Sequence, residues 1–319
     1  MKTVVLDGYG LNPGDLSWKE IEELTQLTVY DRTPRDLVVE RSREADAILT
    51  NKTVIDADAI RALPKLKYIG VLATGYNVVD TEAARKAGIA VTNIPAYSTM
   101  SVAQNVFALL LEATNHVGHF TSANKEGRWA SNPDFCWWDS PLTELAGKNF
   151  GIIGFGHIGY AVARIALAFG MKVTAATSKE KSELPEGVEK SDIDGVFRTC
   201  DVVSLHCPLT DGTYHLVDSR RLSLMKPDAI VINTGRGPLV DEDALAEALK
   251  EKRIRAAGVD VLSSEPPAPG NPLLSAPGCY ITPHVSWATT EARIRLMHIA
   301  AENLKAFIEG KPRNVVNGI

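Results

Sequence analysis

Residues 152–159 read IIGFGHIG, a G-x-G-x-x-G pattern that directly follows an apolar run and precedes apolar residues at helical spacing. This context separates a dinucleotide-binding turn from a chance cluster of glycines. Gly154 permits the tight turn, Gly156 lets the backbone approach a pyrophosphate, and Gly159 lets the helix pack close to the strand. The first N–H groups of such a helix are free to bind an anion. The stretch therefore predicts a strand–turn–helix unit for a dinucleotide, with a glycine-rich turn of some other α/β protein as the alternative.

Size and composition narrow the class of protein. A chain of 319 residues is long enough for two domains of ordinary size, each with its own core. The net charge of −5 is unlike that of proteins that bind nucleic acid or an anionic membrane surface. No apolar stretch is long enough to span a membrane, and the four cysteines form no C-x-x-C pair. We therefore expect a cytoplasmic protein with no metal site that binds neither nucleic acid nor membrane.

Short apolar runs alternate with helical patterns in both parts of the chain, which is typical of parallel sheets with helices on both faces. The expected strands are residues 3–6, 27–30, 47–50, 68–72 and 90–92, then 150–153, 172–176, 202–205, 229–233, 256–261 and 279–282. We expect two doubly wound α/β domains with a cleft between them. The dinucleotide-binding domain would cover residues 98–289. A discontinuous substrate domain would cover residues 1–97 and 290–319.

A long helix is expected over residues 100–116, and the segment that follows it has a different character. Residues 122–141 are irregular and rich in aromatic side chains, among them Trp129, Phe135, Trp137 and Trp138. A long loop of this kind needs a partner for its apolar surface. It either covers an edge of the core or packs against a second subunit.

Ligands of open α/β sheets bind at the carboxyl ends of the strands, so the residues just after each apolar run are the candidate site. Hydride transfer to a carbonyl needs a positioned cofactor, a donor to the carbonyl oxygen and a source of a proton. A guanidinium matches a substrate carboxylate, and histidine suits proton delivery at neutral pH. Arg236, Glu265 and His284 form one such set. Other candidates after apolar runs are Thr177, Ser178, Lys179, Cys207, Pro208, Thr234, Gly235 and Asp260.

Several ordered motifs resemble the D-isomer-specific 2-hydroxyacid dehydrogenase family, whose members have a Rossmann cofactor domain and a flavodoxin-like substrate domain. Residues 154–159 resemble the family's cofactor turn, and residues 72–80, LATGYNVVD, resemble its substrate loop. The segments similar to those that bear its arginine, glutamate and histidine are residues 233–237 (NTGRG), 260–266 (DVLSSEP) and 282–287 (TPHVSW). The matches are spread over more than half of the chain.

The resemblance implies a role for each matched residue. His284 would donate a proton in reduction, Glu265 would keep His284 protonated, and Arg236 would bind the substrate carboxylate. Asp260 would hold the nicotinamide amide. The remaining implied cofactor residues are His157, Ile158, Thr213, Cys207, Pro208, Thr234, Gly235 and Trp287. The implied substrate loop residues are Ala73, Thr74 and Gly75, whose backbone N–H groups would hold the carboxylate.

Two other segments, residues 135–148 and the LTNKT segment that contains Asn51, are similar to the glycerate dehydrogenase (hydroxypyruvate reductase) branch of the family. This implies that a small 2-keto acid, hydroxypyruvate or glyoxylate, is reduced to D-glycerate or glycolate. It also implies a homodimer in which Trp138 of one subunit closes the substrate pocket of the other. The alternatives are a lactate-like or larger 2-hydroxy acid, and a corepressor-like protein that binds nucleotide without turnover.

The choice between NAD and NADP depends on the end of the second strand of the cofactor domain. Family members that prefer NAD usually carry aspartate there, but alignment on the glycine turn places Thr177 at this position. Ser178, Lys179 and Lys181 follow, and hydroxyls with lysines can bind a ribose phosphate. Glu180 and Glu183 oppose this reading, as does a simple capping role for Thr177. On balance we expect NADP to be accepted.

Overall fold

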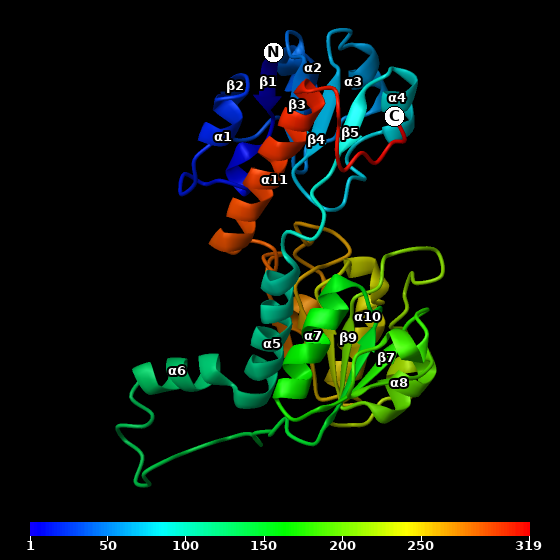
Figure 1. Cartoon of the computed structure of the whole chain (residues 1–319). Coiled ribbons are helices and arrows are strands. Elements are labelled where there is room, and N and C mark those ends of the chain that lie inside the picture. The colour runs from blue at the N-terminus through cyan, green and yellow to red at the C-terminus, as the bar shows by residue number, and fades with distance from the viewer. The chain divides into compact units, whose positions relative to one another are not determined.

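The computed structural model describes residues 1–319 and divides into two compact units (Figure 1). Unit 1 consists of Met1–Ser98 together with Ala288–Ile319, and unit 2 is Thr99–Trp287. Each unit contains one sheet in which all neighbouring strands are parallel. This confirms the expected pair of parallel α/β folds. No helix has both the length and the apolar character that crossing a membrane requires.

The sheet of unit 1 has the strand order β2-β1-β3-β4-β5. Its strands are β1 (Lys2–Val5), β2 (Gln26–Val29), β3 (Ala47–Thr50), β4 (Tyr68–Val71) and β5 (Ala90–Thr92). Every residue of β3 and β4 is buried, as expected for strands with helices on both faces. The chain reverses direction across the sheet between β1 and β3, so the carboxyl ends of these strands flank a switch point.

The helices of unit 1 are short except for the last one. They are α1 (Lys19–Glu22), α2 (Val38–Ser42), α3 (Ala57–Arg61), α4 (Thr81–Lys86) and α11 (Thr290–Ile308), with 3₁₀ turns at Gly8–Gly10 and Arg35–Leu37. Helix α11 packs against α1 and β4. Its buried Arg293 donates two hydrogen bonds to the Asp15 carboxylate, at 2.7 and 2.6 Å. The final helix therefore completes the core that the first 98 residues begin.

The sheet of unit 2 has the order β12-β11-β10-β9-β6-β7-β8. Its strands are β6 (Asn149–Ile153), β7 (Lys172–Ala176), β8 (Val188–Lys190), β9 (Val202–Leu205), β10 (Ile230–Asn233), β11 (Ala256–Val259) and β12 (Cys279–Ile281). From β6 the chain moves outward through β7 to β8, then returns to place β9 on the other side of β6. The switch point between β6 and β9 is where such a sheet binds a nucleotide.

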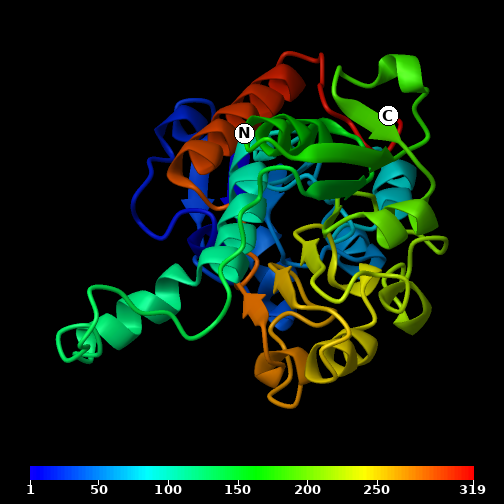
Figure 2. The same ribbon diagram turned by 90° about the horizontal axis from the view of Figure 1, so that it is seen from below.

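Helices cover both faces of this sheet (Figures 1 and 2). The helices of unit 2 are α5 (Thr99–Asn115), α6 (Val117–Lys125), α7 (His157–Ala168), α8 (Ile193–Thr199), α9 (Ser219–Leu222) and α10 (Glu242–Lys250), with 3₁₀ turns at Lys181–Glu183, Gly237–Leu239 and Pro272–Ser275. All of them except α6 pack on the sheet. Helices α5 and α7 share one apolar cluster with the sheet, and α8 to α10 share the other. Phe107 of α5 stacks on Phe150 of β6 and on Phe169. Helix α5 is thereby fixed against the sheet.

The glycine turn between β6 and α7 has the geometry that the sequence predicts. Gly154 has a φ of +93°, and a Cβ there would lie 2.5 Å from the Cys207 nitrogen. A Cβ on Gly159 would lie 2.3 Å from the Gly154 carbonyl oxygen. Both positions therefore require glycine, one for its conformation and the other for the close approach of α7 to the turn.

Helix α6 and the chain that follows it extend away from the sheet as an arm, defined here as residues 117–142 (Figures 1 and 2). The prediction of irregular structure from residue 122 onward is wrong for residues 122–125, which form the end of α6. The helix forms because this stretch has neither proline nor a strong turn signal. Beyond it, Trp137 packs edge-on against Phe120 with the Arg128 guanidinium 3.7 Å from its ring centre.

Candidate active site

A groove of about 920 Å³ lies at the carboxyl ends of β6, β7 and β9. Its lining includes eight of the predicted cofactor residues, which are Gly154, Gly156, Thr177, Ser178, Lys179, Cys207, Pro208 and Thr213. Six further lining residues were not predicted from the sequence, namely Ser191, Asp192, Ile193, Asp194, Leu216 and Arg221. Two carboxylates lie in this wall: Asp194 forms an ion pair with Arg221 at 3.0 Å, and Asp192 accepts a hydrogen bond from the Gly195 nitrogen at 2.5 Å.

The start of α7 offers donors to this groove. Gly156 is the N-cap, and no side chain caps the helix. The first helical N–H groups, beginning at His157 and Ile158, therefore have no side-chain acceptor of their own and can bind a phosphate. The close approach of turn and helix at Gly154 and Gly159 provides a backbone cradle that a Cβ would fill. This part of the groove fits a dinucleotide pyrophosphate.

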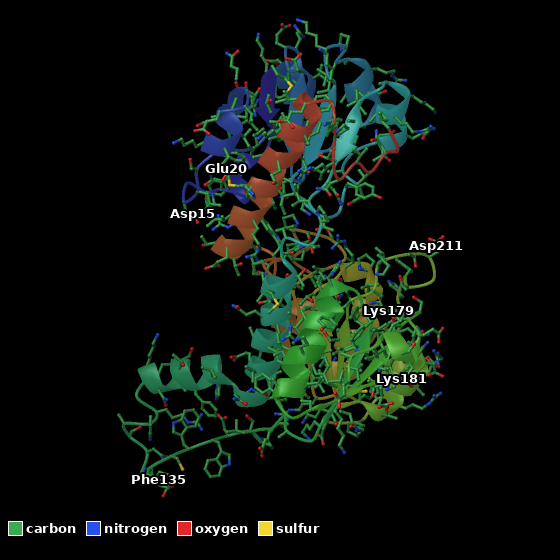
Figure 3. The ribbon with its side chains drawn as sticks, viewed as in Figure 1. Asp15, Glu20, Phe135, Lys179, Lys181 and Asp211 are labelled. Carbon is green, nitrogen blue, oxygen red and sulfur yellow. The ribbon has the colours of Figure 1, made fainter.

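The turn after β7 carries one lysine that is free of ion pairs. Thr177 Oγ1 accepts a hydrogen bond from the Lys179 nitrogen at 3.2 Å, and Lys179 Nζ lies 6.0 Å from the Phe155 ring centre. Lys181 points elsewhere, because its Nζ donates to the Val188 oxygen at 2.6 Å and pairs with Glu189 at 2.7 Å (Figure 3). Lys179 is thus the only lysine that lines the groove.

His206 also lines the groove, and its sequence context predicted no role for it. Its Nε2 lies 2.8 Å from the hydroxyl of the fully buried Ser204 on β9. Removal of the imidazole from water lowers the pKa of His206 to about 4. The ring is therefore neutral at physiological pH and adds no charge to the groove. Burial likewise raises the pKa of the neighbouring Cys207 thiol, which keeps it protonated.

The structure brings His284 and Glu265 together at the same edge of the sheet. His284 Nδ1 lies 2.6 Å from Glu265 Oε2, and the other carboxylate oxygen, Oε1, accepts from the Leu262 nitrogen at 3.1 Å. This leaves the Nε2 side of the imidazole facing away from Glu265. A histidine oriented by a carboxylate in this way can hold a proton and deliver it from the opposite nitrogen.

Arg236 follows β10 and is exposed. It makes one side-chain hydrogen bond, from Nη1 to the Gly235 oxygen at 2.8 Å. It does not contact His284 or Glu265, and most of its N–H donors remain available to a carboxylate ligand. Thr234, two residues earlier, has a buried hydroxyl with no hydrogen-bond partner. An orphaned hydroxyl at a strand end of this sheet is a further feature that suits a bound nucleotide.

Asp260 is 2% exposed, and both of its carboxylate oxygens have protein partners. Oδ1 accepts from Thr282 Oγ1 at 2.5 Å and from the Val285 nitrogen at 2.9 Å, and Oδ2 accepts from the Ser286 nitrogen at 2.9 Å. Asp260 therefore organises the loop that carries His284. Trp287 ends this loop as the last residue of unit 2, and neither Trp287 nor Asp260 lines the groove.

In unit 1, the predicted substrate residues lie after β3 and β4. Asn51 is buried and donates from Nδ2 to the Leu72 oxygen at 2.7 Å. Thr74 Oγ1 donates to the Ile94 oxygen at 2.8 Å, and the Ala73 oxygen accepts from the Ile94 nitrogen. The bonds to Ile94 hold the backbone of residues 73 and 74 next to the segment that follows β5. Trp138 lies in the arm of unit 2 and is 65% exposed.

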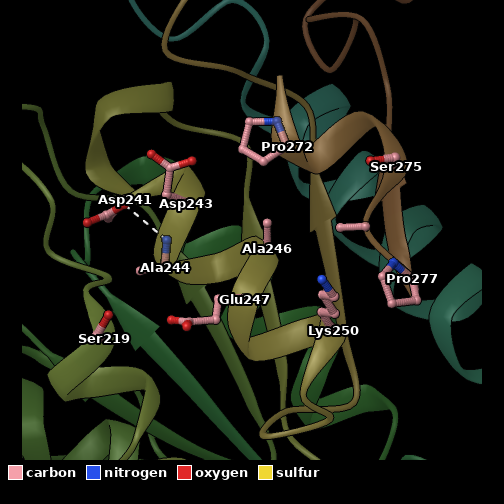
Figure 4. Close-up of a pocket in the computed structure, with 11 residues that line it drawn as sticks. Ser219, Asp241, Asp243, Ala244, Ala246, Glu247, Lys250, Pro272, Ser275 and Pro277 are labelled. Carbon is pink, nitrogen blue, oxygen red and sulfur yellow. Dashed lines mark hydrogen bonds between the residues drawn. The ribbon is translucent and has the colours of Figure 1, made fainter. Parts of the chain in front are cut away.

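A second cavity of unit 2, of about 860 Å³, contains none of the predicted site residues. Its lining comes from α9, α10 and the segment around Pro272–Ser275 (Figure 4). Asp241, one of its carboxylates, caps α10 by accepting from the Ala244 nitrogen. The candidate site is therefore the groove and the strand ends beside it, not this cavity.

Comparisons with known proteins agree with this geometry. Residues 107–286 match the family model described as "D-isomer specific 2-hydroxyacid dehydrogenase, NAD binding domain". The chain is 49% identical to a hydroxypyruvate reductase of Blautia hydrogenotrophica, with 99% of this chain and 100% of that protein covered. It is 40% identical to a glycerate dehydrogenase of Methylorubrum extorquens, with 99% and 98% covered.

A solved structure of an acyclic imino acid reductase in complex with NADPH and D-Arg superposes with a TM-score of 0.84 at 33% identity, covering 99% of this chain and 100% of that one. The groove and the pair formed by His284 and Glu265 agree with these full-length matches. This chain belongs to the D-isomer-specific 2-hydroxyacid dehydrogenase family of nicotinamide-dependent oxidoreductases.

Proposed function

We propose that the protein reduces hydroxypyruvate to D-glycerate and also reduces glyoxylate to glycolate. The observation that carries the proposal is the 2.6 Å contact between His284 and Glu265, at the strand ends of the sheet that holds the nucleotide groove. The similarity to a named hydroxypyruvate reductase and a named glycerate dehydrogenase over almost the whole chain supports the choice of substrate.

The side chains divide the reaction between them. A bound nicotinamide supplies the hydride. Arg236 binds the carboxylate of the 2-keto acid and polarises its carbonyl, because its guanidinium has free donors. His284 donates a proton to the carbonyl oxygen as negative charge develops there, and Glu265 orients the imidazole through its contact with Nδ1. In the oxidation of a 2-hydroxy acid the same histidine accepts the proton.

The groove would hold the nucleotide along its length. The pyrophosphate would lie against Gly156, His157 and Ile158 at the start of α7. Thr177, Ser178 and Lys179 would meet the adenine ribose, and we propose that they accept NADPH because no carboxylate stands at Thr177 and Lys179 is free of ion pairs. The related reductase solved with NADPH supports this preference.

The two units would have separate tasks. We propose that residues 98–289 form the cofactor domain and that residues 1–97 with 290–319 form the substrate domain. In the latter, Ala73, Thr74 and Gly75 would hold the substrate carboxylate through backbone N–H groups. Asn51 would support that loop through its bond to the Leu72 oxygen.

We also propose that the protein is a cytoplasmic homodimer joined through the arm. Phe135 and Trp138 of the arm are 89% and 65% exposed, which is unusual for large apolar side chains on a free surface. The arm is nevertheless internally ordered by the Asp139 carboxylate, which pairs with Arg128 at 2.6 Å and with His119 at 2.9 Å. A rigid apolar surface suits a second copy of the chain, and Trp138 would then reach the partner's substrate pocket.

The proposed reaction is tested by following the consumption of NADPH and NADH with hydroxypyruvate, glyoxylate and pyruvate. We expect hydroxypyruvate to have the highest kcat/KM. His284→Asn should lower kcat by about 10²- to 10⁴-fold, because general acid catalysis contributes about that much. Nucleotide binding should be unchanged. His298→Asn is the matched control, since this exposed histidine also pairs with a glutamate, Glu20, but lies on α11 of unit 1. Equal activity of His284→Asn and the native protein would reject the assignment.

A further inference from the structure

The loop that carries His284 is held in a conformation that its sequence does not favour. His284 has a φ of +54°, in the left-handed region that residues other than glycine rarely adopt. Its nitrogen donates to the Asp260 oxygen at 2.7 Å and to the Thr282 oxygen at 3.0 Å. A backbone in this conformation persists only where the surroundings fix it. The contacts of the loop therefore determine where the imidazole points.

One set of contacts comes from inside the sheet. The Asp260 carboxylate accepts from Thr282, Val285 and Ser286 and so gathers both ends of the loop around its own β-strand end. These three hydrogen bonds hold the loop against the end of β11. All three donors belong to the loop, and their one acceptor is the Asp260 side chain.

A second set of contacts comes from α5. Ser101 Oγ donates to the Ser286 oxygen at 2.5 Å, and Asn105 Nδ2 donates to the Ser286 hydroxyl at 2.7 Å. The same amide nitrogen lies 3.4 Å from Thr282 Oγ1. Ser101 and Asn105 are four residues apart and so lie on one face of the helix. Ser286 is 4% exposed, so the bonds from α5 are shielded from water.

The helix that provides these donors cannot easily adjust. Phe107 of α5 stacks on Phe150 of the central strand and on Phe169, and Val106, Leu109 and Leu110 are buried in the same cluster. The packing of α5 therefore fixes the position from which the Asn105 amide donates its hydrogen bond. Ser286, two residues after His284, is its target.

We propose that Asn105 is a positioning residue that acts through Ser286 to hold His284 in register with Glu265 for proton transfer. The inference rests on the proposed role of His284 as the proton donor. Asn105 touches neither nucleotide groove nor His284, so its effect would be confined to the chemical step. A shift of about 1 Å in a catalytic group can cost about 100-fold in rate.

The test compares Asn105→Leu, which keeps the volume but cannot donate, with Asn149→Leu. Asn149 also donates one side-chain hydrogen bond, to the Thr199 oxygen at 3.0 Å, but it stands at the amino end of β6, away from the strand ends that carry the site. We expect Asn105→Leu to lower kcat by about 10-fold or more. The KM for hydroxypyruvate and the Kd for nucleotide should stay within about twofold of native. Nucleotide deuterated at the transferred position should show a larger isotope effect on kcat, because the chemical step becomes more rate-limiting.

Ser286→Ala removes the acceptor hydroxyl of the same bond and carries the test if Asn105→Leu does not fold. It should also lower kcat, and the double variant should lose no more than Asn105→Leu alone, because Asn105→Leu already removes the bond to Ser286. A kcat within twofold of native for both variants, additive losses, or an equal loss in Asn149→Leu would overturn the proposal. Failure of the proposed function is distinct, because His284→Asn would then also leave kcat intact.

Discussion

His206 lines the nucleotide groove, and its lowered pKa makes the stability of the fold depend on pH. Its pKa in the folded protein is about 4, below the ordinary value of 6.5, because the ring is removed from water beside Ser204. Between these two pH values the unfolded chain binds a proton that the folded chain does not. Stability must therefore fall as pH falls from about 6.5 to about 4.

We expect His206→Gln, which keeps a partner for the Ser204 hydroxyl, to flatten this acid dependence. The difference should be at most about 3 kcal/mol at pH 4, from about 1.4 kcal/mol per pKa unit. Urea unfolding of both proteins between pH 4 and 7 measures it. His298→Gln provides an opposite control: the Glu20 carboxylate raises the pKa of His298, so its contribution is present at low pH and is lost as pH rises. Parallel native and His206→Gln curves would contradict the expectation.

Thr177 is the residue at which cofactor preference can be changed. A carboxylate at this position would repel a ribose phosphate and accept hydrogen bonds from ribose hydroxyls. We expect Thr177→Asp to raise the ratio of kcat/KM with NADH to that with NADPH by about 10-fold or more. Lys179→Ala should weaken NADPH selectively, whereas Lys181→Ala should not, since Lys181 is paired with Glu189. A uniform loss with both nucleotides would show that the turn does not read the phosphate.

Among the elements, the arm differs most from the rest of the fold. It is ordered by its own contacts, with Trp137 between Phe120 and Arg128 and the Trp129 indole donating to the Phe135 oxygen at 3.0 Å. The Phe135 side chain is nevertheless 89% exposed, at the end of the arm in Figure 3. An ordered element with a large exposed apolar side chain at its end is typical of a protein–protein interface, which fits the proposed contact with a second copy of the chain.

If the protein is the proposed dimer, we expect Phe135→Asp to convert it to a monomer, because the substitution places a charge in the proposed interface. Leu274→Asp is the matched control, as Leu274 is 48% exposed on the Pro272–Ser275 turn outside the arm. Light scattering after size exclusion gives the mass of each. Trp138→Ala should leave the dimer intact and raise the KM for hydroxypyruvate. A native protein that is already monomeric would exclude the arm as a dimer interface.

At the scale of the whole molecule, the sequence predicts those features that burial or local geometry imposes. The central strands were predictable because both faces are buried, which leaves largely apolar runs such as VVSL in β9 and IVIN in β10. The glycine turn and the pairing of Glu265 with His284 followed from motifs. Strand β8 was missed because its VEK sequence carries two exposed charges at the sheet edge.

Other features of the site depend on contacts between residues far apart in the chain. Nothing local to Asn105 indicates a bond to Ser286, 181 positions later. The three donors around Asp260 are likewise 22 to 26 residues away. The only available signal was the spacing of Ser101 and Asn105, two polar residues on one face of a largely apolar helix.

The return of α11 to unit 1 also has a consequence for synthesis of the chain. Residues 99–287 leave the ribosome before α11, so the inserted unit has its full sequence while the surrounding one still lacks its last helix. Until then the surfaces of β4 and α1 that α11 covers stay open, and Asp15 has no Arg293 to pair with. The nucleotide-binding unit is thus the first part of the nascent polypeptide that can finish folding, and a cofactor already present in the cell can capture it.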